Sequence, residues 1–279
     1  MDALVSTEWL AANLGAPDLL VFDCSTYLPN EAGNKQDGFR AAHIPGARLF
    51  DIDAIADDET DLPHMVPTPA RFARLAGALG ISNAHRVVFY DQHGWRAAPR
   101  GWWMLRLFGH DKVAVLDGGL PLWRKEGRPV EAGDAAPAAP ARFVADFRAR
   151  MLRGIGDVKQ VLADGSALVL DARAKGRFDG TAPEPRAGLP AGHMPGARNL
   201  PVTEVAGADG RLKDPAALRA LFAAAGVDGS KPVVTSCGSG VTACVLAFAA
   251  ARAGLPEPAV YDGSWTEWAL RPETEKATA

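Results

Sequence analysis

One series of short motifs occurs twice along the chain, in the same order. LVFDCS at 20–25 resembles LVLDAR at 168–173, and AHIPGAR at 42–48 resembles GHMPGAR at 192–198. TPARFARLAGALGIS at 68–82 is matched by DPAALRALFAAAGVD at 214–228, VVFYD at 87–91 by VVTSC at 233–237, and LDGGLPLW at 116–123 by YDGSWTEW at 261–268. A preserved order of matches indicates an internal duplication, so the two halves are expected to share one fold.

A length of 279 residues exceeds that of a typical single domain and accommodates two. Between the copies, PVEAGDAAPAAPA at 129–141 has Pro, Ala and Gly where a folded segment would have an apolar period, as expected of an exposed linker. We therefore place the boundary near residue 140. The N-terminal domain would span 1–140, including the linker 129–140, and the C-terminal domain 141–279.

Short β-rich runs alternate with helical segments in both copies, which predicts an α/β fold with parallel sheets flanked by helices. The predicted strands are Leu20–Asp23, Val87–Tyr90, Val113–Leu116, Leu168–Asp171, Val233–Ser236 and Ala259–Tyr261. Two helices have clear start signals, because Thr68-Pro69 and Asp214-Pro215 each put a capping side chain before a proline suited to the first turn. Gly80 and Gly226 are expected to end those helices.

Composition excludes several classes of protein. Hydrophobic residues make up 48% and charged residues 23%, as in an ordinary folded protein. The net charge of −3 and the lack of any Lys/Arg run argue against a nucleic-acid partner. No apolar stretch is long enough to span a membrane, and the start MDALVSTEWLAANLG lacks the pattern of a signal peptide, so a cytoplasmic location is expected.

Cysteines occur only at positions 24, 237 and 244, too few and too scattered for a disulfide framework. A reducing compartment fits this usage. Neither CxxC nor HExxH spacing is present, so the sequence gives no support for a zinc site, and no metal is expected.

The segment VVTSCGSGVTACVLAFAAARAG at 233–254 predicts a strand, a tight glycine-containing loop and an apolar helix ending near Gly254. Cys237 would lie at the start of the loop, near the helix N-terminus. Unpaired N–H groups and the helix dipole there favour an anion, so the thiolate nucleophile should be stabilised. The N–H groups from Gly238 to Ala243 could likewise stabilise the outer sulfur of a persulfide.

Each cysteine could instead have a purely structural role, because free cysteine is among the most buried residues. For Cys237 the glycines and the strand–loop–helix context favour function. Cys24 is matched by Ala172 in the second copy, and Cys244 lies within an apolar helix, so a core role is expected for both.

The loop CGSGVTA at 237–243 resembles the active-site loop of the mercaptopyruvate sulfurtransferases, in the rhodanese superfamily. The resemblance runs essentially end to end and includes the HxPGA turns at His43 and His193. It implies two tandem rhodanese-like domains, the first one inactive, with Asp91 at the position matching Cys237. Because His43 and His193 recur in the copy without the cysteine, a structural role in the turn is expected for both.

The resemblance also implies an activity. Sulfur would pass from 3-mercaptopyruvate to Cys237 as a persulfide, releasing pyruvate, and then to thioredoxin, a small thiol or cyanide, with no cofactor. The loop residues Gly238, Gly240, Val241 and Thr242 would contact the substrate.

The loop favours this donor over thiosulfate. Relatives that use thiosulfate, a dianion, have basic side chains in a CRKGVTA-like loop, whereas this chain has Gly238 and Ser239 there. The carboxylate and ketone of mercaptopyruvate match the forked donors of arginine. Arg177 and Arg186 lie in GRFDGTAPEPRAG, which resembles the family's RFxGTxPEPR motif for binding these groups.

The family's Ser-His-Asp arrangement maps onto Ser239, His64 and Asp53. His64 would move a proton through Ser239, and Asp53 would fix the His64 tautomer. Leu62-Pro63 departs from the family pattern just before His64. Arg100, after the degenerate loop of the first copy, is expected to support the interface between the domains.

Three alternatives stay open. The first is a thiosulfate sulfurtransferase and the second a phosphatase of related fold, although its loop would be one residue longer and would end in an arginine. The third is a non-catalytic module that carries a persulfide.

Overall fold

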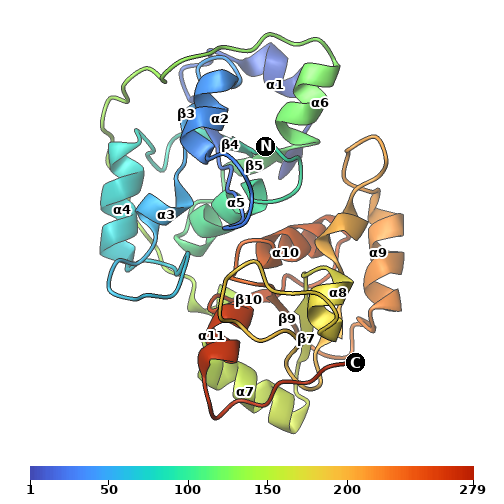
Figure 1. Ribbon diagram of the computed structural model, residues 1–279. Helices are drawn as coiled ribbons and strands as arrows, with labels where there is room; N and C mark the ends of the chain where they lie inside the picture. The colour runs from blue at the N-terminus through green and yellow to red at the C-terminus, as the bar shows by residue number, and fades with distance from the viewer.

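The computed structural model describes residues 1–279 as two α/β domains, one above the other in Figure 1. Each domain contains a five-stranded sheet in which all paired strands are parallel. The strand order is β1-β5-β4-β2-β3 in the first sheet and β6-β10-β9-β7-β8 in the second, so each strand has its counterpart in the other domain. The predicted duplication and fold class are confirmed.

The N-terminal domain has the strands β1 (Leu4–Val5), β2 (Leu19–Asp23), β3 (Arg48–Leu49), β4 (Arg86–Tyr90) and β5 (Val113–Leu116). Its helices are α1 (Thr7–Asn13), α2 (Lys35–Ala41), α3 (Ile52–Ile55), α4 (Pro69–Ala78), α5 (Ala98–Leu107) and α6 (Gly119–Lys125).

The C-terminal domain has the strands β6 (Leu152–Arg153), β7 (Leu168–Asp171), β8 (Arg198–Asn199), β9 (Val233–Ser236) and β10 (Ala259–Tyr261). Its helices are α7 (Ile155–Asp164), α8 (Lys175–Asp179), α9 (Pro215–Ala224), α10 (Ala243–Arg252) and α11 (Ser264–Leu270), with 3₁₀ turns at Ala149–Met151 and Val202–Val205.

All six predicted strands form, and two of them begin one residue earlier, at Leu19 and Arg86. Their apolar runs are buried because helices cover both faces of each parallel sheet. The helix signals also hold. Thr68 and Asp214 accept hydrogen bonds from first-turn amides, and Gly80 and Gly226 follow the helix ends with left-handed φ angles of 84° and 90°.

Helices α5 and α10 pack against each other between the two domains, as Figure 1 shows. Trp102 of α5 contacts Phe248 of α10 edge to face, with ring centroids 5.0 Å apart. One apolar cluster of 43 buried residues runs from the first domain into the second through this contact. The domains are therefore joined by a core, and segments of both can build one site.

The two HxPGA turns have the same construction. His43 Nδ1 lies 2.9 Å from the carbonyl oxygen of Phe39, and His193 Nδ1 lies 2.8 Å from that of Phe178. Each imidazole also stacks on the phenylalanine ring, at 4.0 and 3.9 Å between centroids. The repeated contacts agree with a structural role for both histidines.

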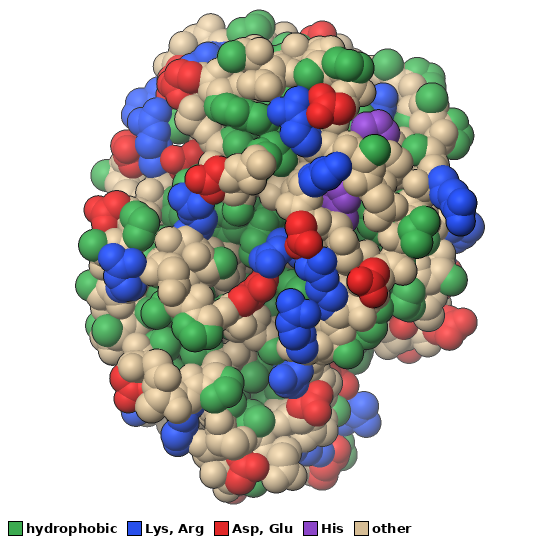
Figure 2. All heavy atoms as spheres, turned by 180° about the vertical axis from the view of Figure 1, so that it is seen from behind, with side chains coloured by type: hydrophobic (Ala, Val, Ile, Leu, Met, Phe, Trp, Pro, Cys, Tyr) green, Lys and Arg blue, Asp and Glu red, His purple; other side chains and the backbone are tan.

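The surface mixes charges of both signs. On the face shown in Figure 2, Lys and Arg side chains lie beside Asp and Glu, with small hydrophobic areas between them. None of the helices combines the length and the apolar character needed to cross a membrane. The segment 129–141 passes along the outside of the N-terminal domain without helix or strand, and the proposed boundary near residue 140 falls within it.

Candidate active site

Cys237 follows the last residue of β9, a central strand of the second sheet. Side chains at the carboxyl end of a central parallel strand face the crevice where α/β proteins bind ligands. Cys237 itself is only 2% exposed, but it lines a cavity of about 320 Å³ between the domains. The thiol is therefore accessible from this cavity rather than sealed in the apolar core.

The loop after Cys237 is held from behind by residues around the start of α11. The hydroxyl oxygen of Ser264 accepts hydrogen bonds from the N–H groups of Cys237 and Gly240, at 3.0 and 3.1 Å, and donates to the carbonyl of Tyr261. Thr266 donates from its backbone N–H and its hydroxyl to the carbonyl of Gly238. Ser264 adopts a left-handed φ of 50°, uncommon for a residue with a side chain, so this support is built at a conformational cost.

Gly240 permits the tight turn of the loop. Its φ is 78°, and a Cβ atom there would lie 2.6 Å from the carbonyl oxygen of Asp262. A side chain at 240 would therefore clash with the backbone. Val241 and Thr242 complete the loop and line the cavity with Gly238 and Ser239 before α10 begins at Ala243.

The remaining loop amides are available to an anion. The N–H groups of Gly238, Ser239, Val241, Thr242 and Ala243 donate to no protein group. The carbonyls of Cys237 and Gly238 accept hydrogen bonds from the residues of α11. In a planar trans peptide the N–H points opposite to the C=O of the preceding residue, so the amides of Gly238 and Ser239 point away from α11. The Gly240 amide, which we expected to face the sulfur, is instead committed to Ser264.

The matching loop of the first domain holds an anion of its own. The buried carboxylate of Asp91 accepts hydrogen bonds from the N–H groups of His93, Arg96, Ala97 and Ala98, at 2.8 to 3.1 Å. Because the two loops are copies of one another, this arrangement demonstrates that such a loop can surround a negative group with amides. In the second domain, the small Cys237 side chain leaves the equivalent space to a ligand.

Arg177 and Arg186 both line the cavity with Cys237. Arg177 is ion-paired to Glu184, with Nη2 2.6 Å from Oε2. Glu184 is almost completely buried and also pairs with the buried Arg173, which in turn binds Asp171 and stacks on Trp265. Glu184 therefore fixes the position of Arg177. The guanidinium of Arg177 passes so close to the loop that a Cβ at residue 238 would lie 2.9 Å from Nη2.

Arg186 has no carboxylate within ion-pair distance. Its Nη2 lies 3.1 Å from Nε2 of His64, and burial lowers the pKa of its guanidinium while leaving it charged at neutral pH. An arginine nitrogen can only donate, so Nε2 of His64 is the acceptor, and the proton of a neutral His64 is on Nδ1. The partly desolvated charge of Arg186 is poised for an anionic ligand.

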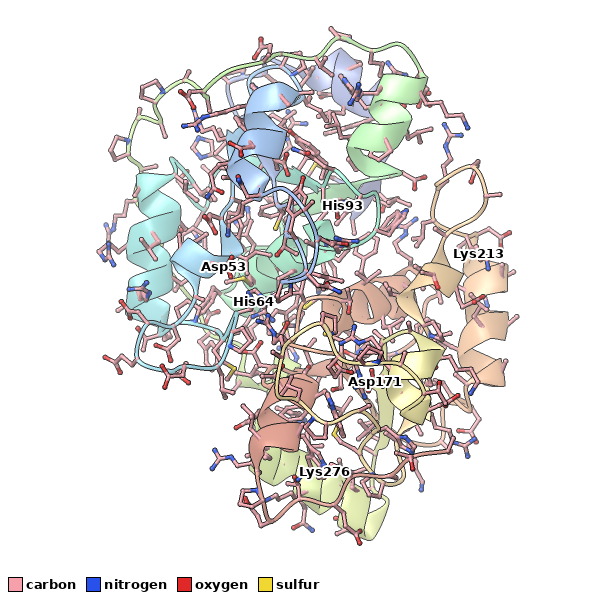
Figure 3. The ribbon with its side chains drawn as sticks, viewed as in Figure 1. Asp53, His64, His93, Asp171, Lys213 and Lys276 are labelled. Atoms are coloured by element: carbon pink, nitrogen blue, oxygen red, sulfur yellow. The ribbon has the colours of Figure 1, made fainter.

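His64 and Asp53 come together as predicted. His64 Nδ1 lies 2.7 Å from Oδ1 of Asp53, and Figure 3 shows both at the edge of the first domain that faces the second. The pKa of Asp53 is lowered by its close contact with His64 and by Lys35, which also contacts its carboxylate. His64 has a left-handed φ of 63°. Ser239 also lines the cavity, but its hydroxyl makes no protein hydrogen bond, and His64 Nε2 contacts Arg186 rather than Ser239.

Arg100 connects the two domains beneath the site. It is completely buried, and its Nη1 lies 2.7 Å from Oδ1 of Asp262 in the second domain. The same nitrogen donates to the carbonyl of Gly240 at 3.4 Å, and Nη2 donates to the carbonyl of His64 at 2.5 Å. One guanidinium thus sets the position of the cysteine loop relative to the histidine, as expected for a residue that supports the interface.

The other two cysteines are core residues. Burial raises the pKa of the Cys24 thiol well above its usual range and that of Cys244 to about 12. Both are protonated at neutral pH, and neither lines the cavity.

Sequence reasoning missed Ser264, Glu184 and Arg173. Glu184 could have been identified, because it lies inside the motif that contains Arg177 and Arg186. An acidic residue between two arginines is expected to form an ion pair with one of them when it is buried. Ser264 had none, since the matching residue of the first copy is Gly119 and the left-handed conformation of a serine is not visible in sequence.

The chain has clear relatives among known proteins. The rhodanese-like domain model matches residues 6–126 and 155–271. The thiosulfate/3-mercaptopyruvate sulfurtransferase 1 of Arabidopsis thaliana is 44% identical over 98% of this chain and 77% of its own length. The human 3-mercaptopyruvate sulfurtransferase is 44% identical over 98% of this chain and 94% of its own.

A solved structure agrees with both. The crystal structure of a 3-mercaptopyruvate sulfotransferase from Escherichia coli, with 37% identity, superposes with a TM-score of 0.86 and covers 95% of this chain and 99% of that one. Two domain matches and near-complete alignments therefore establish that this chain belongs to the rhodanese family.

Proposed function

We propose that the protein is a 3-mercaptopyruvate sulfurtransferase, which moves sulfur from 3-mercaptopyruvate through a persulfide on Cys237 to a thiol acceptor or cyanide. The single observation that carries the proposal is the cavity in which the Cys237 thiol, the unpaired amides of its loop and the guanidinium of Arg186 meet. Relatives of near-full length have this activity in their names.

The donor is bound through its carboxylate and ketone. Arg186 offers a charge with no carboxylate partner, and Arg177 offers N–H donors that Glu184 holds in place. A bound carboxylate would compete with His64 for Nη2 of Arg186. Donor binding would therefore free Nε2 of His64 at the moment when a proton must be moved.

Sulfur transfer begins with attack of the Cys237 thiolate on the donor's sulfur. A bond forms between the two sulfur atoms, and the carbon–sulfur bond of the donor breaks. The electron pair of that bond goes to the three-carbon fragment, which leaves as the enolate of pyruvate. The proton of the donor's thiol is transferred to the enolate carbon, so pyruvate is released and the outer sulfur of the persulfide is left anionic. In this scheme His64, freed at Nε2, takes the proton from the donor's thiol through the hydroxyl of Ser239 and returns it to the enolate, while Asp53 maintains the tautomer.

The persulfide is stabilised by the backbone of the loop. Its outer sulfur is anionic, and the amides of residues such as Gly238 and Thr242 would surround it as the first-domain amides surround the carboxylate of Asp91. An acceptor thiolate then attacks the outer sulfur, and the Cys237 thiolate is restored. No metal or organic cofactor takes part in this scheme.

Thiosulfate is the second candidate donor, because the Arabidopsis relative has both donors in its name. The site favours mercaptopyruvate. Gly238 leaves the space beside the loop to Arg177, and a basic residue at 238 of the kind found in thiosulfate-using relatives would displace that guanidinium. A cytoplasmic location stays a prediction from the sequence.

The test uses two half-reactions. Wild-type protein incubated with 3-mercaptopyruvate should release one pyruvate per chain in a single turnover and gain one sulfur atom on Cys237 by mass spectrometry. C237S should do neither, whereas C244S, the matched control at a buried thiol, should do both. Pyruvate release by C237S at a near wild-type rate would contradict the proposal, and a ratio of kcat/KM favouring thiosulfate would reassign the donor.

A further inference from the structure

The cavity has a wall that the donor does not require. Apart from His64, the residues of the first domain that line it belong to two loops, the segment 26–29 after β2 and the degenerate loop that follows β4. The cavity volume of about 320 Å³ exceeds what a three-carbon keto acid fills. This wall includes Arg96, the one arginine that the first domain contributes to the cavity, and the donor reaction has no use for it.

Arg96 has free hydrogen-bonding capacity. Its Nη1 donates to Glu31 at 2.6 Å, while Nε and Nη2 donate to no protein group, and the side chain keeps 26% of its surface exposed. A guanidinium presents its N–H donors in a fork that can hold a second carboxylate beside the first. The unused edge of Arg96 therefore offers, within the cavity, the donors that a carboxylate requires.

The position of Arg96 is set in advance. Its backbone N–H donates to the buried carboxylate of Asp91, and its partner Glu31 is itself fixed by accepting from the backbone N–H of Leu28. Next to it, His93 packs edge to face on Tyr27, with ring centroids 5.0 Å apart. A rigid cation beside aromatic surface resembles a binding site more than a solvated surface arginine.

We propose that Arg96 forms an acceptor subsite, which binds the carboxylate of a small anionic thiol while its sulfur attacks the persulfide. This inference rests on the proposed function and assigns to the first domain a part of the second half-reaction. The donor's carboxylate uses Arg186 and Arg177, and the acceptor's carboxylate uses the arginine of the first domain.

The chemistry of the step is balanced. The acceptor enters as a thiolate, having lost its proton to solvent, and its sulfur forms a bond with the outer sulfur of the Cys237 persulfide. The bond between the two sulfurs on Cys237 breaks, and its electron pair returns to Cys237 as the thiolate. The product is the acceptor's persulfide anion, and no oxidant or reductant is consumed.

The experiment isolates this step. Protein is loaded with sulfur by 3-mercaptopyruvate, desalted, and mixed with 3-mercaptopropionate or with 2-mercaptoethanol, which lacks the carboxylate. Loss of the persulfide is followed by quenched mass spectrometry. R96Q should lower the second-order rate constant for 3-mercaptopropionate about tenfold, the effect of losing one charge-assisted hydrogen bond, and leave that for 2-mercaptoethanol unchanged.

Two controls make the outcome unambiguous. R74Q removes the charge of an exposed arginine that forms no ion pair, so it should leave both rate constants unchanged. Single-turnover pyruvate release, measured without an acceptor, should be the same in R96Q as in wild type. An equal response of the two thiols to R96Q, or none, would overturn the subsite. A wild-type protein that releases no pyruvate would instead refute the proposed function on which it rests.

Discussion

Arg100 of the first domain and Asp262 of the second form an ion pair that is closed to solvent, with 2.7 Å between Nη1 and Oδ1. The same two side chains bind the backbone of the segment that carries His64, because Arg100 donates to the carbonyl of His64 and Asp262 accepts from the N–H of Val66. This ion pair therefore couples the position of the first domain to that of the cysteine loop.

Replacement of Arg100 by methionine should therefore impair stability and activity together. An unpaired buried carboxylate costs about 3–5 kcal/mol, which corresponds to a fall of roughly 10 °C in Tm for a protein of this size. R100M/D262L should recover part of the loss, since removal of both charges is less costly than removal of one. Differential scanning calorimetry with R74M as the control measures this, and an unchanged Tm for R100M would contradict it.

Ser264 should be required for the loop rather than for the chemistry. S264A leaves the amides of Cys237 and Gly240 without an acceptor, and each buried unsatisfied group costs about 1–3 kcal/mol. We expect kcat to fall about tenfold while KM for 3-mercaptopyruvate changes little, because Arg177 and Arg186 are untouched. S236A is the matched control, since the buried Ser236 hydroxyl has no hydrogen-bond partner. Equal kinetics for the two variants would refute this role of Ser264.

The preference for 3-mercaptopyruvate over thiosulfate should depend on residues 238 and 239 of the loop. G238R/S239K introduces two cations and forces Arg177 away from its position beside residue 238. The ratio of kcat/KM for thiosulfate to that for 3-mercaptopyruvate should rise at least about tenfold. G238A, which adds only a methyl group, separates the effect of space from that of charge. A ratio unchanged in the double variant would show that the donor is selected elsewhere.

Only one cysteine should be alkylated in the folded protein near pH 8. A thiol reacts as its thiolate, and the raised pKa values of Cys24 and Cys244, the latter about 12, keep both protonated until far higher pH. Iodoacetamide should therefore add one group to wild type, on Cys237, and none to C237S. Peptide mapping checks this, and labelling of Cys244 at a rate similar to Cys237 would contradict the assignment of its core role.

Much of the fold could be predicted because it depends on local patterns. The strand ending at Ser236 and the helix capped by Asp214 are specified by apolar runs, prolines and capping side chains that lie together in the sequence. Each of these patterns occurs in both copies, which strengthened the prediction. Cys237 was identified from its strand–loop–helix segment, whereas Arg177 and Arg186 were identified from the resemblance to the family's RFxGTxPEPR motif.

The contacts within the site could not be predicted, because they join distant segments. Nothing local indicates that Arg186 donates to His64, or that the Gly240 amide is taken by Ser264. The first pair depends on how the two domains pack across α5 and α10, and small changes in that packing would exchange one partner for another. The second pair depends on the left-handed conformation of Ser264 within the second domain. The link between Ser239 and His64 therefore stays a prediction for the complex with the donor.

The loop amides that bind Asp91 limit the number of sulfur atoms that one molecule can carry. These amides already donate to the carboxylate of Asp91, so they are not available to a persulfide sulfur. Under the proposed function we therefore expect one sulfur atom per polypeptide, although the chain contains two copies of the loop.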